Sequence, residues 1–175
     1  MSNEFQVLVL GAESTGKTLF LKRLQSAVQD GVDEKNFESV PSLVPTIGTN
    51  LASVVLNRKR ISLRELGGAM APVWKKYFED AGAVVFMVDA SNRFQISASV
   101  VLLYDVLKAE PLAQLPVLLL FNKTDLFSSL SIQEIKFIFR INDLKRTLPQ
   151  KLELIECSTK TGDGMEKIID WLKTI

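Results

Sequence analysis

The sequence predicts an α/β fold in which helices cover both faces of a mostly parallel sheet. Short runs of apolar and β-branched residues alternate with longer segments of helical periodicity. Several of these runs are apolar at every position, which is typical of strands buried on both faces of a parallel sheet. Alternation of this kind indicates a layered α/β arrangement. The length of 175 residues is close to the usual domain size, so we expect one domain over residues 1–175.

Six segments are expected to form strands. Three runs are apolar throughout, apart from Gln6 in the first: Phe5–Leu10, Ala83–Val88 and Val117–Phe121. Two further runs, Leu51–Leu56 and Ile61–Leu66, are separated by the four polar residues 57–60, which indicates a β-hairpin. A shorter strand is expected at Leu152–Ile155.

Helical periodicity fills most of the remaining sequence. The expected helices are Thr18–Gln29, Pro72–Ala81, Ile96–Ala109, Ile132–Phe139 and Met165–Lys173. Ser131 and Glu134 have the spacing of a capping box, which supports the start of the fourth helix. Residues Asp30–Pro45 form the one long loop expected, and loops of this length are usually functional or disordered.

The composition excludes several classes of chemistry. The chain has no histidine, so Ser-His-Asp and Cys-His nucleophile systems and histidine metal sites are impossible. A single cysteine excludes internal disulfides and cysteine zinc clusters, which makes a reducing cytosol the expected location. Lys and Arg number 21 against 20 Asp and Glu, and a net charge of +1 gives no broad attraction for nucleic acid.

The sequence also lacks signals for membrane insertion. No apolar stretch approaches the ~18–20 residues that span a bilayer, and the N-terminus has no signal-peptide pattern. Ser2 stands where N-myristoylation requires glycine, and the C-terminus has no cysteine for prenylation. We therefore expect a cytoplasmic monomer without a lipid anchor, which reaches membranes only through partners.

The first chemical motif follows the first predicted strand directly. Residues 11–18 read Gly-Ala-Glu-Ser-Thr-Gly-Lys-Thr, which matches the pattern G-x-x-x-x-G-K-[ST] of a phosphate loop in the required strand–helix context. Its glycines allow backbone N–H groups to face phosphate oxygens at a helix N-terminus. Lys17 would neutralise phosphate charge, and the Thr18 hydroxyl would bind Mg²⁺. The alternative is a chance glycine turn with a capping threonine.

The second motif ends the Val117–Phe121 strand. Residues 122–125 read Asn-Lys-Thr-Asp, at the strand end where open α/β sheets bind ligands. The carboxylate of Asp125 can accept hydrogen bonds from the ring N–H and exocyclic amine of guanine. Adenine lacks this donor pair, so the buried carboxylate would be left unpaired. Taken alone, the tetrapeptide could be a polar turn, but its order after the phosphate loop favours a guanine nucleotide. A P-loop kinase or ATPase does not explain it.

Together these motifs resemble those of small GTPases of the Ras superfamily, in the ADP-ribosylation-factor-like branch. Four more segments carry the resemblance. Pro45–Gly48 resembles the first switch, Glu65–Gly68 the second, and Val88–Ser91 the following strand end. Cys157–Lys160 resembles the last guanine-binding loop. The resemblance implies a Ras-like P-loop NTPase fold, whose six-stranded mostly parallel sheet has one antiparallel strand.

The resemblance also implies a role for individual residues. Thr18 and Thr46 would bind Mg²⁺, Glu65 would lie near its water shell, and Gly67 or Gly68 would donate an N–H to the γ-phosphate. The implied nucleotide-contacting residues are Glu13, Ser14, Thr15, Gly16, Lys17, Thr18, Thr46, Gly68, Asn122, Lys123, Asp125, Ser158, Thr159 and Lys160. The implied function is a switch that binds GTP or GDP with Mg²⁺ and recruits effector proteins in the GTP form.

The departures from the family pattern concern hydrolysis. Where the family has a glutamine that positions the attacking water, this sequence has Ala69. Because unassisted hydrolysis runs at only roughly 10⁻⁴ s⁻¹ even with that glutamine, we expect a very slow reaction here. Two interpretations remain open. The chain is a GTPase whose activating protein supplies the missing groups, or a binding module that stays GTP-loaded and is controlled by nucleotide exchange.

Other departures concern the partner surface. Arg64 stands where the branch commonly has tryptophan and Thr49 where it has phenylalanine, while Trp74 and Tyr77 remain. Arg64 could instead be a solvated strand residue without a role in partner binding. Glu65 replaces the usual aspartate and is one methylene longer. We expect Cys157 to be a small buried side chain beside the guanine loop rather than a reactive thiol.

Overall fold

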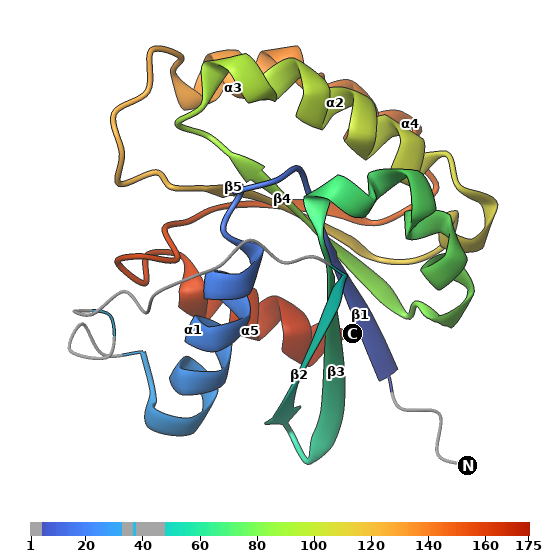
Figure 1. Cartoon of the computed structure of the whole chain (residues 1–175), viewed down its shortest axis with the longest axis vertical. Coiled ribbons are helices and arrows are strands. Elements are labelled where there is room, and N and C mark those ends of the chain that lie inside the picture. Colours follow the sequence, from blue (N-terminus) through green and yellow to red (C-terminus); the bar gives the residue numbers. More distant parts are fainter. Residues whose placement is uncertain (1–4, 33–36, 38–47) are drawn as a thin grey trace.

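The computed structural model describes residues 5–32, 37 and 48–175, which form one six-stranded sheet with helices around it (Figure 1). The strands are β1 (Phe5–Leu10), β2 (Thr49–Leu56), β3 (Lys59–Leu66), β4 (Ala83–Asp89), β5 (Val117–Asn122) and β6 (Leu152–Glu156). Their order in the sheet is β2-β3-β1-β4-β5-β6. Each of the six predicted strands is confirmed, with ends shifted by at most two residues.

The pairing pattern is the one that the sequence predicts. Strand β2 is antiparallel to β3, and all other neighbours are parallel. The β2–β3 hairpin closes through Asn57 and Arg58, whose φ angles of 49° and 64° are those of a two-residue turn that matches the strand twist. The sheet is therefore mixed, with its one antiparallel strand at an edge.

The helices match the predictions less evenly. They are α1 (Lys17–Asp30), α2 (Arg93–Leu107), α3 (Ile132–Ile138), α4 (Ile141–Thr147) and α5 (Met165–Thr174), with 3-10 segments η2 (Gly68–Asp80) and η3 (Glu110–Leu112). The capping box is confirmed, since Ser131 and Glu134 exchange both of its hydrogen bonds. The helix expected over Pro72–Ala81 is instead the 3-10 segment η2, which contains a proline that cannot donate a helical hydrogen bond. Helix α4 was not predicted.

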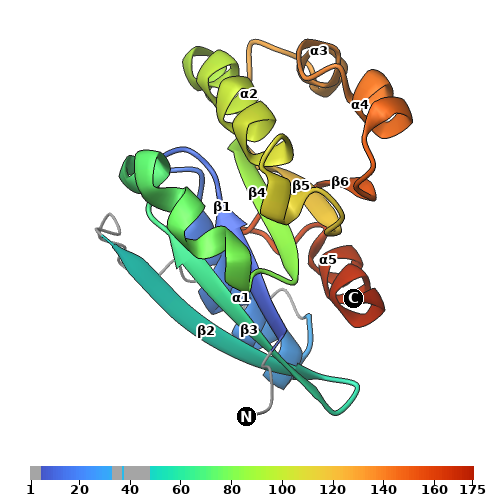
Figure 2. The ribbon, with the colours of Figure 1, turned by 90° about the vertical axis from the view of Figure 1, so that its right-hand side faces the viewer.

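Two apolar layers sandwich the sheet, and their membership follows the alternation along each strand. In β1, Val7 and Val9 pack with the residues of α1 and α5, whereas Leu8 and Leu10 pack with those of η2 and α2. Figures 1 and 2 show α1 and α5 on one face and α2, α3 and α4 on the other. Every position of β4 and β5 is buried, because helices cover both faces of these central strands.

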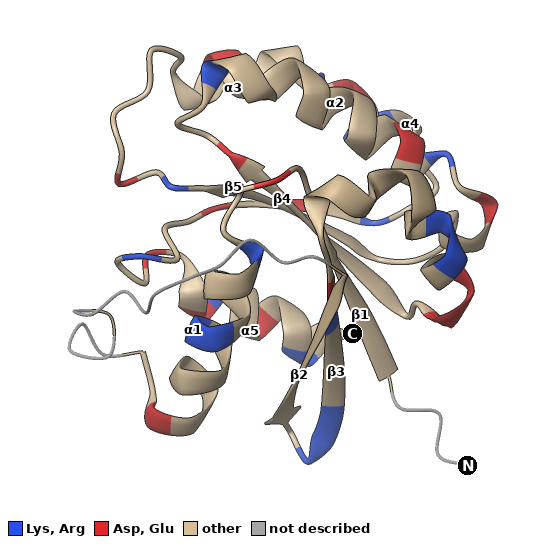
Figure 3. Ribbon diagram, in the orientation of Figure 1, with Lys and Arg blue, Asp and Glu red and all other residues tan. Residues whose placement is uncertain are grey.

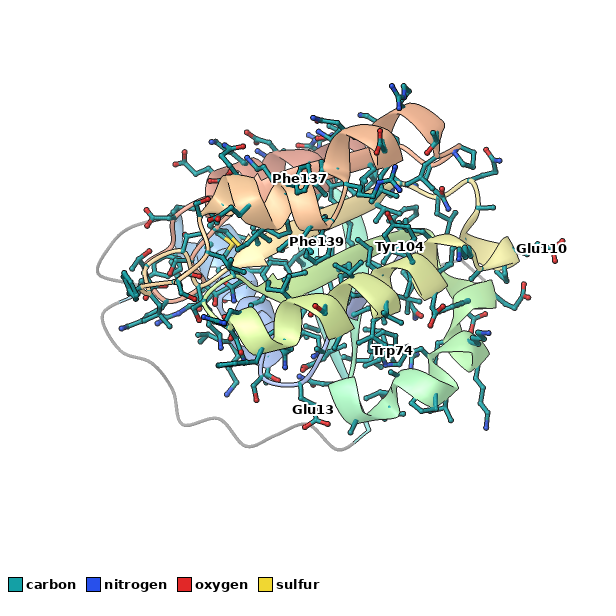
Figure 4. All side chains as sticks on the ribbon, turned by 90° about the horizontal axis from the view of Figure 1, so that it is seen from above. Glu13, Trp74, Tyr104, Glu110, Phe137 and Phe139 are labelled. Atoms are coloured by element: carbon teal, nitrogen blue, oxygen red, sulfur yellow. The ribbon has the colours of Figure 1, made fainter. Side chains whose placement is uncertain are left out.

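The two phenylalanines of the α3 region have opposite environments. The sequence spacing of two indicates that they do not share one helix face, and the structure confirms this. Phe139 is fully buried, with its ring centroid 5.3 Å from that of Phe121, whereas Phe137 is 84% exposed (Figure 4). The buried ring fixes the end of α3, where Arg140 adopts a left-handed backbone and α4 begins.

Positively and negatively charged residues are interspersed along the described elements, and neither sign is confined to one part of the ribbon (Figure 3). At the tip of the β2–β3 hairpin, Lys59 donates to the carbonyl of Ile175 at 2.8 Å and lies 4.1 Å from the ring centroid of Phe5. This lysine therefore contacts its own chain. Among the described residues, no helix combines the length and the apolar character needed to cross a bilayer.

Candidate functional site

The segment Gly11–Thr18, the phosphate loop, joins β1 to α1 through an unusual backbone path. Gly11 and Gly16 have φ angles of 144° and 98°, and Ser14 has a φ of 59°. A Cβ at Gly11 would overlap the carbonyl oxygen of Met87, and one at Gly16 would lie 2.5 Å from Nδ2 of Asn122. Only glycine satisfies both the backbone angles and the space at these two positions.

Lys17, the first residue of α1, points its amine back into the phosphate loop. Its Nζ donates to the carbonyl oxygens of Gly11 at 2.9 Å and Ala12 at 2.7 Å, and the residue is 5% exposed. Burial lowers the pKa of Lys17 from 10.5 to about 8, although the charges of Glu65 and Glu13 oppose this shift. A buried, poorly solvated cation beside a helix N-terminus favours the binding of an anion.

At Thr18, the residue after Lys17, side chains of α1, β2 and β3 meet. The Thr18 hydroxyl donates to Oε1 of Glu65 at 2.6 Å, and Nδ2 of Asn50 donates to the other oxygen, Oε2, at 3.3 Å. Glu65 is 1% exposed near the end of β3. A hydroxyl and a carboxylate beside a phosphate loop are hard oxygen donors of the kind that Mg²⁺ prefers, so this site fits the metal that the sequence implies.

The second predicted switch lies directly against the phosphate loop. A Cβ at Gly68 would overlap the Glu13 nitrogen and lie 2.6 Å from the carbonyl carbon of Ala12. Gly67 donates its N–H to Gly48 O at 3.0 Å and accepts from the Trp74 indole at 3.0 Å. Ala69, which follows Gly68, is exposed. The glycine pair therefore sits where the ligand phosphates are expected.

Asn122 connects the phosphate loop to both predicted guanine loops. Its Nδ2 donates to the carbonyl of Thr15 at 2.8 Å and to the Thr159 hydroxyl at 3.2 Å. Its Oδ1 accepts from the Thr159 N–H at 3.0 Å. Asn122 is fully buried at the end of β5. One side chain thus holds together three segments that are far apart in the sequence.

Lys123 bridges two further loops beside Asn122. Its Nζ donates to the carbonyl of Ser14 at 2.7 Å and forms an ion pair with Oδ2 of Asp89 at 2.6 Å. Asp89 ends β4, is 5% exposed and also accepts from the Ser91 hydroxyl at 2.6 Å. Asp89 was not among the predicted site residues, although a carboxylate at the carboxyl end of a buried strand is a signal for one.

Asp125 lies against the last loop. Its Oδ1 accepts from the Ser158 hydroxyl at 2.7 Å, and its Oδ2 is 3.9 Å from the Lys160 amine. Cys157 is 1% exposed, and burial raises the pKa of its thiol to about 12, so it is a buried, protonated side chain as predicted.

The structure brings the predicted site residues together with one exception, Thr46, which lies outside the described residues together with most of the Asp30–Pro45 loop. The remaining residues all belong to loops at the carboxyl ends of β1, β3, β5 and β6 or to the start of α1. Asn50 is a site residue that the sequence did not predict. Its only signal is that the hairpin places it opposite Glu65 in the β2–β3 register.

The residues expected on the partner surface differ in exposure. Thr49 is exposed, whereas Trp74 is 2% exposed and holds Gly67 from within, so it is not a surface side chain. Arg64 lies 5.7 Å from the ring centroid of Tyr77 and donates its Nε to Gln6 at 3.2 Å. The arginine is therefore partly buried against its own chain rather than fully solvated.

Comparisons with known proteins agree with this arrangement. The family model described as the ADP-ribosylation factor family matches residues 1–175. The Arg64–Gly68 sequence indicates a likeness to ADP-ribosylation factor-like protein 16. The human protein of that name is 41% identical over 167 residues, which are 95% of this chain and 83% of the relative. ADP-ribosylation factor-like protein 1 of Drosophila melanogaster is 28% identical over 173 residues, 98% of this chain and 88% of that protein.

A solved structure shares the fold. It is the Arl6 BBS3 small GTPase of Trypanosoma brucei with the bound nucleotide analogue GppNp, with a TM-score of 0.79 and 20% sequence identity. The match covers 97% of this chain and 95% of that one, so the fold is that of a Ras-like GTPase. The chain belongs to the ADP-ribosylation factor family of small GTPases, which are nucleotide-binding switches.

Proposed function

We propose that this protein binds GTP and GDP together with Mg²⁺ in the loops around Asn122, and that its GTP form recruits effector proteins. The observation that carries the proposal is the set of hydrogen bonds by which Asn122 joins the phosphate loop at Thr15 to the last loop at Thr159. Phosphate-binding and base-binding groups are thereby held at fixed relative positions, which preorganises a site for a whole nucleotide.

Asp125 is the group that would select guanine. Its carboxylate can accept from the ring N–H and the exocyclic amine of guanine, and the Ser158 hydroxyl and Lys160 amine orient it. An adenine would leave this oriented carboxylate without its two donors, which costs more than a missing apolar contact. This argues against the alternative of a P-loop ATPase.

Phosphate binding would fall to Lys17 and the backbone N–H groups of residues 13–18. Lys17 is already directed into the loop, and a phosphate would satisfy the charge that burial now disfavours. Thr18, with Thr46 in the GTP form, would hold Mg²⁺, which when bound neutralises phosphate charge. These roles rest on the family resemblance and on the donor chemistry of the site.

The contact between Gly68 and the phosphate loop supports a switch. A γ-phosphate in the loop would meet the N–H of Gly68, so its presence or absence would be transmitted to η2, which begins at that residue. Beside η2 and α2 lies a cavity of about 330 Å³, whose more accessible lining includes Pro72, Lys75 and Leu102. A surface that depends on the position of η2 is thus available to effector proteins.

Hydrolysis is expected to be weak, because the methyl group of Ala69 cannot orient water. The alternative is a binding module that remains GTP-bound and is controlled by exchange or abundance. Single-turnover hydrolysis with and without cell extract separates the two. If GTP is converted within minutes only when extract is added, the extract contains an activating protein. If extract has no such effect, control by an exchange factor is favoured. We further propose a cytoplasmic monomer that reaches membranes through partner proteins.

Nucleotide identity is the direct test of the proposed function. The purified protein is denatured after incubation with Mg²⁺ and a mixture of GTP and ATP, and the released nucleotide is identified by chromatography. We expect guanine nucleotide at close to one per chain, and recovery of adenine nucleotide or of none contradicts the proposal. A pull-down with GTP-analogue-loaded and GDP-loaded protein then tests effector recruitment.

A further inference from the structure

The carboxylate of Glu65 accepts a direct hydrogen bond from the hydroxyl that is expected to bind the metal. Oε1 of Glu65 is 2.6 Å from the Thr18 hydroxyl oxygen, which leaves no room for a water molecule between them. By resemblance, the usual aspartate at this position reaches the metal through water. The glutamate is one methylene longer and brings its oxygen up to the hydroxyl itself.

The separation of these oxygens matches the geometry of a shared metal. Two neighbouring ligands of an octahedral Mg²⁺ with bonds of 2.0–2.1 Å are about 2.9 Å apart. The observed 2.6 Å therefore needs to increase only slightly for one ion to bind both oxygens. In that arrangement the Thr18 proton turns away from Glu65, and a lone pair of the hydroxyl faces the ion in its place.

The two carboxylate oxygens of Glu65 accept hydrogen bonds from different residues. Asn50 donates to Oε2 at 3.3 Å across the β2–β3 pair, where the two residues stand opposite each other in register. This contact orients Oε1 toward Thr18. The residue is 1% exposed, and a buried carboxylate is stabilised by a neighbouring cation. The hydrogen bond from Asn50 and the burial hold Oε1 in a position from which it could contact a metal ion directly.

We propose that Glu65 binds the nucleotide-associated Mg²⁺ directly through Oε1, in place of one water molecule, with Asn50 as a positioning residue. The inference rests on the proposed function, because the metal enters the site with the nucleotide. It adds a second protein ligand from the described residues to Thr18, which the resemblance implies. It also gives a physical consequence to the replacement of aspartate by glutamate.

Counting the water ligands of a bound metal tests this proposal. Mn²⁺, which prefers the same oxygen ligands, replaces Mg²⁺ in the GDP complex, and broadening of its electron paramagnetic resonance lines by ¹⁷O-labelled water gives the number of bound waters. We expect the wild type to hold one water fewer than Glu65→Asp. Equal numbers in the two proteins overturn the proposal.

A second variant separates side-chain length from charge and covers a failure of Glu65→Asp to fold. Glu65→Gln keeps the length and offers a carbonyl oxygen, so we expect the wild-type water number with an Mn²⁺ affinity reduced about 10-fold. A water number higher than that of the wild type would overturn the proposal. If neither the wild type nor Glu65→Gln binds Mn²⁺ with GDP, the proposed function itself fails, which is a different outcome from equal water numbers.

The positioning role of Asn50 has its own readout. Asn50→Ala is expected to raise several-fold the Mg²⁺ concentration needed to slow GDP release, because Glu65 is no longer oriented. The same substitution in the Glu65→Asp background should have little further effect, since the direct contact is already lost. Equal effects in the two backgrounds would show that Asn50 acts only on the stability of the hairpin and would overturn its positioning role.

Discussion

Gly68 at the start of η2 lies in backbone contact with Glu13 of the phosphate loop, so closely that a Cβ at position 68 would overlap the Glu13 nitrogen. The nearest atoms that this Cβ would meet, the Glu13 nitrogen and the Ala12 carbonyl carbon, belong to the backbone. They cannot move aside as the end of a flexible side chain can. We therefore predict that Gly68→Ala displaces η2 from the phosphate loop. The expected cost is about 1–3 kcal/mol of unfolding free energy, with a large loss of affinity for GTP and a smaller one for GDP.

Gly31→Ala is a matched control for that prediction. Gly31 has a φ of 85° but open space around the position of a Cβ, so alanine there meets only backbone strain. We expect a loss of about 1 kcal/mol in denaturant unfolding and unchanged nucleotide affinity. If Gly68→Ala and Gly31→Ala behave alike in fluorescent-nucleotide titrations, the contact between Gly68 and the phosphate loop has no part in binding.

The lowered pKa of Lys17 predicts that the nucleotide-free protein becomes more stable as the pH rises. The folded state releases the Lys17 proton near pH 8, whereas the unfolded chain keeps it up to about 10.5. Between these values the unfolded state binds more protons, so the free energy of unfolding increases with pH. The total gain is about 3 kcal/mol. Below pH 8 both states are protonated, and this contribution is constant.

Lys17→Met provides the reference for the pH series. The difference in unfolding free energy between wild type and Lys17→Met should be flat below pH 8 and should then rise by at most about 1.4 kcal/mol per pH unit. Denaturant titrations between pH 7 and 10 measure it. A difference that stays constant over this range would show that burial does not disfavour the charge on Lys17.

The ion pair between Lys123 and Asp89 predicts a role in nucleotide retention. Asp89→Asn removes the charge that holds the Lys123 amine near Ser14, so the loop after β5 loses its link to the end of β4. We expect GDP to dissociate about 10-fold faster, measured by displacement of a fluorescent analogue. Glu156→Gln is the control: Lys136 and Glu156 also lie 2.6 Å apart, but on the surface, where an ion pair contributes little. Similar rates for Asp89→Asn and wild type would contradict the role.

Ala69 predicts a gain of function. If the methyl group is what withholds hydrolysis, Ala69→Gln should raise single-turnover GTP hydrolysis toward roughly 10⁻⁴ s⁻¹. Ala71→Gln places the same side chain two residues further along η2 and should leave the rate unchanged. An equal rate in wild type and Ala69→Gln would show that another feature of the second switch limits the reaction.

Much of the fold could be predicted because its signals are local. The continuous apolar runs that became β4 and β5 are buried at every position, and the Ser131–Glu134 capping box formed as expected. The break between α3 and α4 could not be predicted. It depends on Phe139, whose packing against Phe121 joins residues 18 positions apart and is decided by tertiary contacts.

The residues of the candidate site likewise include some that local motifs predict and others that depend on tertiary contacts. Lys17, Asn122 and Asp125 belong to motifs with fixed spacing, so their roles could be proposed from the sequence. Asn50 and Asp89 gained their partners from the register of β2 with β3 and from the order of β4 and β5. The prediction that Trp74 belongs to the partner surface is wrong, because its indole N–H donates to the Gly67 carbonyl inside the protein.

The buried side chain of Asn122 has a consequence for how nucleotide leaves. Since it fastens Thr15 on one side and Thr159 on the other, the phosphate end and the base end of the site cannot open independently. A protein that pulls on either loop works against the same hydrogen bonds, and once they break both ends loosen together. Release would then be a single cooperative event, and a regulator could trigger it from the base side without touching a phosphate.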